Sequence, residues 1–84
     1  MLALPYLAGT ECISILKRFG YRLRSQSGGF ATLQRETNVV IVPEASTLSP
    51  TLVGALVRTA KVDPHDFLRE LADESAEPPS KKVA

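Results

Sequence analysis

Between residues 20 and 43 the chain alternates hydrophobic and polar side chains with the two-residue period that is typical of β-strands. A strand over 21–26 and a second over 30–34 flank the breaker Ser27-Gly28-Gly29. A mostly β-branched run at 39–42 follows the polar turn at 36–38. The pattern predicts a meander of three antiparallel strands, around which the rest of the chain is arranged.

Helical periodicity marks the segments on either side of this meander. Gly9-Thr10-Glu11 opens a helix that Gly20 ends, and its apolar positions recur at helical spacing: Cys12, Ile13, Ile15, Leu16 and Phe19. Ser49-Pro50 provides an N-cap and a proline at the first helical position, so a second helix begins there. Asp63-Pro64 caps a short last helix whose apolar residues can close the core: Phe67, Leu68 and Leu71.

We therefore expect a small single domain of the α+β class over residues 9–72. Its order is helix, three-stranded antiparallel sheet and helix, with a short extra C-terminal helix. Residues 1–8 form an N-terminal leader to the domain. Residues 73–84 are polar, contain prolines and lack apolar periodicity, so a disordered tail is expected there.

Regular hairpins would turn one face of the sheet toward the helices and leave the other face exposed. In that register Gln26 lies opposite Phe30, Arg24 lies opposite Thr32 and Ile41, and Arg22 lies opposite Gln34 and Val39. The outer face then combines two arginines with an aromatic and two β-branched residues, which predicts a contact patch. The candidate binding residues are Arg22, Arg24, Gln26, Phe30, Thr32, Val39 and Ile41. A solvated face with scattered apolar side chains is the alternative interpretation of the same residues.

Composition narrows the class of protein. The 84 residues are 44% hydrophobic and 23% charged with a net charge of +1, which is typical of a globular domain and excludes disorder of the whole chain. Five basic residues and one acidic residue precede Glu36, so the basic part is the first helix and the first two strands. No apolar run reaches the length of a membrane span, and we expect a cytoplasmic protein without a membrane partner.

Few residues are available for chemistry. The single cysteine, Cys12, excludes an internal disulfide and lies at an apolar helical position, where a buried side chain is expected. One cysteine and one histidine do not make a metal site, and no nucleotide-binding fingerprint occurs. We therefore predict no metal, no cofactor and no small-molecule substrate.

The order of elements and several residue runs resemble the HicA family, small toxins of bacterial toxin–antitoxin pairs with a fold similar to the double-stranded-RNA-binding domain. The family's Gly-x-Glu opening, its helix and its Gly-aromatic end resemble residues 9–21. Its arginine-glutamine-lysine-glycine-serine-histidine segment aligns without gaps on residues 25–30. Its Val-x-Val-Pro strand aligns on residues 40–43, and its Thr-Leu helix with a trailing phenylalanine aligns on Thr51-Leu52 and Phe67. The resemblance covers roughly Ala8 to Leu71.

The resemblance implies a function that this chain does not retain in full. In HicA toxins the histidine of the Gly-Ser-His segment is the catalytic residue of RNA cleavage, and here that position is Phe30, which has no exchangeable proton. Ser27 and Ala45 stand where the family carries a lysine and often a histidine. His65 lies in the last helix, and nothing in the sequence places it near Phe30. No catalytic residue is predicted.

Three functions remain open. The first is a noncatalytic HicA-like binding module that uses the outer face for a protein partner or for self-association. The alternative is RNA binding without cleavage, with Arg22 and Arg24 on phosphates and Phe30 stacked on a base. The third, ranked last, is an active messenger-RNA interferase that uses another residue.

Overall fold

The computed structural model describes residues 4–76, which form three helices and three strands. In chain order these are α1 (Gly9–Arg18), β1 (Arg22–Ser27), β2 (Phe30–Arg35), β3 (Asn38–Pro43), α2 (Pro50–Thr59) and α3 (Pro64–Ala76). The predicted α+β class and its order of elements are confirmed. Residues 1–3 and 77–84, which include most of the predicted tail, lie outside the described residues.

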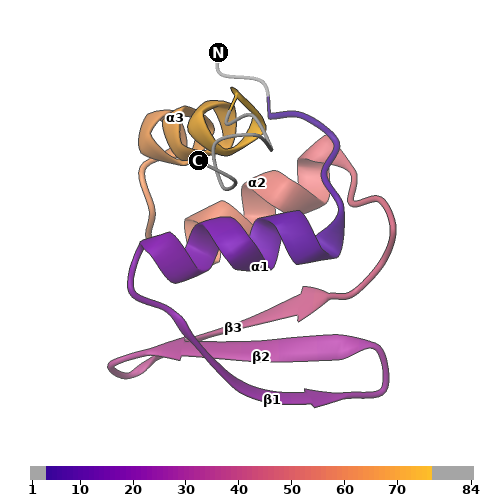
Figure 1. Ribbon diagram of the computed structural model, residues 1–84. Helices are drawn as coiled ribbons and strands as arrows, with labels where there is room; N and C mark the ends of the chain where they lie inside the picture. The colour runs from indigo at the N-terminus through magenta and orange to yellow at the C-terminus, as the bar shows by residue number, and fades with distance from the viewer. Residues whose placement is uncertain (1–3, 77–84) are drawn as a thin grey trace, which may run out of the picture.

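The strands form one antiparallel sheet in the order β1-β2-β3, and the helices cover one of its faces. Figure 1 shows α1 and α2 between the sheet and α3, so the molecule has three tiers. Both α1 and α2 contact β3, and both contact α3. Among residues 4–76 no helix lies on the second face of the sheet, and β1 is an edge strand whose six residues are all exposed.

Local sequence signals explain where the helices begin. In α2 the Ser49 hydroxyl accepts a hydrogen bond from the Leu52 amide at 3.2 Å. In α3 the Asp63 carboxylate accepts one from the His65 amide at 2.8 Å, and this bond lowers the pKa of Asp63. The last helix has 13 residues and runs to Ala76, four residues into the segment for which a tail was expected.

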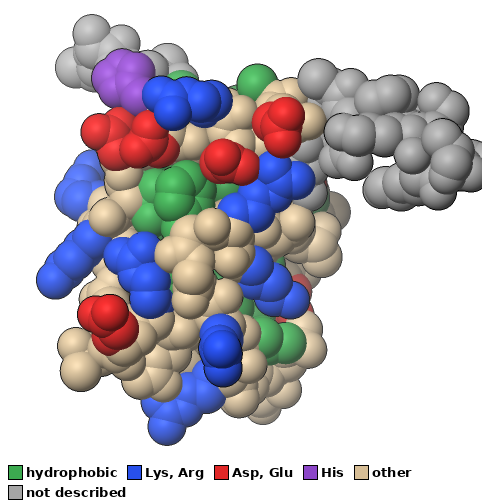
Figure 2. All heavy atoms as spheres, turned by 60° about the vertical axis from the view of Figure 1, so that its left-hand side comes forward, with side chains coloured by type: hydrophobic (Ala, Val, Ile, Leu, Met, Phe, Trp, Pro, Cys, Tyr) green, Lys and Arg blue, Asp and Glu red, His purple; other side chains and the backbone are tan. Residues whose placement is uncertain are grey.

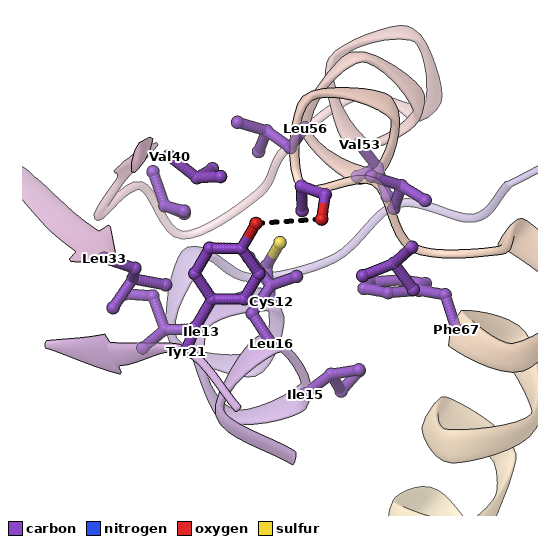
Figure 3. Packing of buried hydrophobic residues seen from close by; sticks show 14 of the residues in the cluster. Cys12, Ile13, Ile15, Leu16, Tyr21, Leu33, Val40, Val53, Leu56 and Phe67 are labelled. Atoms are coloured by element: carbon purple, nitrogen blue, oxygen red, sulfur yellow. Dashed lines mark hydrogen bonds between the residues drawn. The ribbon is translucent and has the colours of Figure 1, made fainter. Parts of the chain in front are cut away.

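The core lies between the inner face of the sheet and the helices, and Figure 3 shows part of it. Cys12 is fully buried as predicted, and its burial raises the pKa of the thiol to about 11. Phe67 is fully buried, so α3 closes the core on the side away from the sheet. Tyr21 is buried at the start of β1, and its hydroxyl donates a hydrogen bond to the Ala60 carbonyl at 2.8 Å.

The predicted register of the first hairpin was right at its open end, where Arg22 pairs with Gln34, and wrong next to the turn. Ser27 pairs with Phe30, so the turn contains only Gly28-Gly29, and both glycines have the positive φ values, 60° and 83°, of a two-residue hairpin turn. This turn places Ser25 opposite Thr32, and Gln26 opposite the buried Ala31.

A β-bulge at Arg24 allows this turn to form while Leu23 still pairs with a core residue. Continued without interruption, the turn's register would oppose Leu23 to Gln34, whereas Leu23 in fact pairs with Leu33, whose side chain is buried. The extra residue lies between Leu23 and Ser25, where the register shifts. The turn therefore directs Gln26 toward the helix side of the sheet and Ser25 and Ser27 outward, and the bulge returns Leu23 to the helix side.

Candidate binding surface on the outer face of the sheet

The outer face of the sheet carries three of the four large apolar side chains that the strands expose. The fourth, Leu23 of β1, is 40% exposed and pairs with the buried Leu33 of the inner face. Phe30 is 50% exposed, Ile41 is 55% exposed and Val39 is 39% exposed. Thr32 pairs with Ile41, and Phe30 pairs with Pro43, so these residues lie side by side on β2 and β3. The second hairpin has the register expected from the sequence, because its inner positions are apolar and buried: Ala31, Leu33, Val40 and Val42.

A shallow hollow of ≈ 370 Å³ lies on this face, and we call it the apolar depression. It is lined by Ser25, Ser27, Phe30, Thr32 and Ile41. Three hydroxyls therefore surround an aromatic and an aliphatic side chain. The sequence predicted Phe30, Thr32 and Ile41 as binding residues and missed the two serines. The signal for them was the Gly28-Gly29 pair, whose two-residue turn makes Ser27 the closing residue of the hairpin.

A second hollow of ≈ 430 Å³, which we call the basic depression, is lined by Arg22, Leu23, Arg24, Gln34 and Glu36. The Arg24 guanidinium donates a hydrogen bond to the Gln34 side-chain oxygen at 2.6 Å, and the Gln34 amide donates to the Glu36 carbonyl at 2.7 Å. Gln34 lies opposite Val39 on the outer face, so this chain holds Arg24 on that face. Among residues 4–76, neither Arg22 nor Arg24 forms an ion pair with a carboxylate.

Gln26 does not join the other predicted site residues. Its amide donates to the carboxylate of Glu44, while the Glu44 backbone amide donates to the Gly29 carbonyl at 2.8 Å. These bonds connect the end of the first hairpin to the segment after β3. Gln26 therefore has a structural contact on the helix side of the sheet, and the remaining six predicted residues share the outer face.

The charged side chains are unevenly distributed between the tiers. Figure 2 shows one side of the molecule, on which most acidic side chains gather near the top, at the height of α3 in Figure 1. Lys and Arg side chains predominate below them, down to the level of the sheet. Arg18 of α1 is an exception, because it forms ion pairs with two acidic residues of α3, Glu70 at 2.9 Å and Asp73 at 3.2 Å. The positive charge of the first two strands is therefore located at the sheet, away from the acidic side chains of α3.

Within the part of the chain that the structure describes, the outer face has the groups for binding and no paired acid and base. His65 lies on α3, beyond the layer of α1 and α2, with its Nδ1 3.5 Å from the Asp63 carboxylate. No group of three metal-ligating side chains occurs among residues 4–76. No helix in this part of the chain has the length and apolar character needed to cross a bilayer. The available interactions are apolar contact, hydroxyl hydrogen bonds and two guanidinium groups.

Comparison with known proteins adds no assignment. No model of a known protein family and no curated protein sequence matches this chain.

Proposed function

We propose that this domain is a noncatalytic binding module that holds a protein partner on the outer face of its sheet. The observation that carries this proposal is the apolar depression, in which Phe30 and Ile41 stay about half exposed although the domain has a well-packed core elsewhere. Aromatic side chains next to arginine are a frequent composition of protein interfaces. The largest apolar patch on a monomeric domain is often functional, and Phe30, Val39 and Ile41 form the apolar patch on the outer face of this sheet.

The resemblance to HicA toxins supports the loss of catalysis. Phe30 stands at the position of the family's catalytic histidine, and a phenyl ring neither accepts nor donates a proton. The exchange replaces a proton carrier with a hydrophobic contact group on an exposed strand. On this view the domain belongs to a toxin–antitoxin-like pair in a bacterial cytoplasm and has kept the fold for binding alone.

Selection from a random peptide library on the purified protein tests this function. Peptides enriched on the wild type are expected to lose about five- to a hundredfold in affinity for Phe30→Ser, because that change removes the aromatic contact, and such contacts are worth roughly 1–3 kcal/mol. Tyr6→Ser is the matched control, since Tyr6 is 68% exposed in the segment before α1 and lies outside the sheet. Peptides that bind Phe30→Ser as well as they bind the wild type would exclude the outer face as the site.

RNA binding without cleavage is a second candidate. Arg22 and Arg24 favour it, because neither forms an ion pair with a carboxylate within residues 4–76 and an exposed aromatic, Phe30, lies on the same face of the sheet. A labelled structured RNA is titrated with protein at low and moderate salt and then run on a denaturing gel. Salt-sensitive binding that Arg24→Ala abolishes would support this candidate. Absence of binding at low salt would exclude it, and cleaved RNA would instead indicate an interferase.

A further inference from the structure

We infer that the partner segment is an extended peptide in which one apolar side chain and one carboxylate are two residues apart. The inference rests on the proposed function, because it describes the ligand of the same outer face. In this arrangement the apolar side chain enters the apolar depression and the carboxylate enters the basic depression. Three observations carry it: the spacing of the two depressions, the charge of the second one, and the size of the apolar patch.

The two depressions are lined by residues of β2 that have the same-face spacing of an extended chain. Thr32 lines the apolar depression and Gln34 lines the basic one, and both lie on β2 with their side chains on the outer face. Two residues of strand span about 7 Å. Side chains two residues apart in an extended peptide point to the same side at the same distance. One short segment can therefore fill both depressions without bending.

The basic depression has an excess of positive charge. Arg22 and Arg24 line it together with one carboxylate, Glu36, and no ion pair joins them within residues 4–76. The 2.6 Å bond to Gln34 orients the Arg24 guanidinium, which reduces the conformational entropy lost on binding. A carboxylate is the group that a guanidinium binds with two parallel hydrogen bonds. The geometry therefore favours an acidic residue over a neutral or basic one.

The size of the apolar patch favours a peptide over a second copy of this chain. Phe30, Val39 and Ile41 are 39–55% exposed. Taking ~200 Å² for a large apolar side chain, they offer on the order of 250–300 Å². A stable protein dimer buries about 800 Å² on each partner, of which roughly 450–500 Å² is apolar. The three hydroxyls of Ser25, Ser27 and Thr32 can in addition bond to the backbone of an extended peptide, which has no internal hydrogen bonds.

The test is a titration of ¹⁵N-labelled protein with short unstructured peptides, followed by amide chemical shifts. One peptide contains phenylalanine, threonine and glutamate in succession. Three others replace the glutamate with glutamine, replace it with lysine, or insert a further residue before it. The glutamate peptide is expected to shift the amides of Thr32 and Gln34. Its affinity should exceed that of each other peptide about three- to tenfold, as expected for a partly exposed charge-assisted bond.

Two variants separate the contributions. Arg24→Gln should remove the preference for glutamate over glutamine and leave the affinity for the glutamine peptide unchanged. Arg58→Gln on α2, which covers the other face of the sheet, is the matched control and should keep the preference. Phe30→Ser should weaken the binding of all four peptides.

Each contrary result has a distinct meaning. If Phe30 is required for binding but all four peptides bind equally well, the inference on the partner is wrong while the binding function stands. If none of the four binds, the inference is also wrong, and the library selection then decides the proposed function independently. If sedimentation shows a dimer of the wild type that Phe30→Ser dissociates, the occupant is a second copy of the chain, and the peptide inference is overturned.

Discussion

Removal of one hydroxyl group from the core tests how the two halves of this fold are joined. Tyr21 follows α1, and its hydroxyl donates to the Ala60 carbonyl at 2.8 Å, beyond the last residue of α2. The same oxygen accepts a bond from the Asn38 amide at the start of β3. The hydroxyl thus connects three segments that are far apart in the sequence, and it satisfies a carbonyl that the end of a helix leaves without a partner.

The loss of stability in Tyr21→Phe depends on the hydrogen bonds that Ala60 and Asn38 keep. Ala60 keeps a bond from the Arg35 guanidinium at 3.3 Å, and Asn38 keeps its bond to the Thr59 carbonyl at 2.8 Å. Each partner therefore keeps one hydrogen bond. The loss of stability should be that of one ordinary hydrogen bond, and not the larger loss expected when a buried polar group has no partner. We expect the free energy of unfolding to fall by about 1 kcal/mol. For a domain of this size that corresponds to a lower melting temperature by about 4–8 °C.

Urea unfolding followed by far-ultraviolet circular dichroism measures this change, since the chain has no tryptophan. The dependence on urea should keep its slope, because the same surface becomes exposed. Tyr6→Phe is the matched control, as Tyr6 is exposed, and it should leave the midpoint unchanged. If Tyr21→Phe is as stable as the wild type, or if Tyr6→Phe lowers the free energy of unfolding by the same amount, the hydroxyl of Tyr21 does not join these segments as described.

Two further predictions concern the helices. Gly9→Ala should lower the free energy of unfolding by about 1–3 kcal/mol, since a Cβ there would lie 2.2 Å from the Pro43 carbonyl oxygen. Gly54→Ala in α2 should raise the free energy of unfolding by about 0.5–1 kcal/mol, because alanine favours a helix and its Cβ would meet only the Leu4 side chain, at 3.4 Å. If urea unfolding gave the two variants the same stability, both predictions would be contradicted. The Cys12 thiol, with its pKa raised to about 11, stays protonated in the folded state while the unfolded thiol ionises near pH 9. Folding stability should therefore fall between pH 9 and 11 by up to about 1.4 kcal/mol per pH unit, and Cys12→Ala should lose that part of the pH dependence; an identical dependence in the variant would refute it.

Much of the candidate surface could be predicted because the second hairpin has strong patterning. Buried apolar residues alternate with outward ones in β2 and β3, so a shift by one residue would expose the core, and only one register is compatible with packing. Phe30, Thr32, Val39 and Ile41 are placed outward by this rule. Arg22 and Arg24 also lie on the predicted face. The error at Gln26, and the omission of Ser25 and Ser27, came from β1.

The helices, the strands and their order could be predicted from the sequence, since caps, proline positions and hydrophobic periods are local signals. Ser49-Pro50 and Asp63-Pro64 begin helices where the sequence indicated, and Gly28-Gly29 forms the turn between the first two strands. The register of β1 was decided only in the tertiary structure. Its six residues are all exposed and mostly polar, so their own pattern prefers no register. The two-residue turn alone would pair Leu23 with Gln34, whereas in the structure Leu23 pairs with the buried Leu33, one residue away. The extra residue of the bulge at Arg24 makes both the turn and this pairing possible.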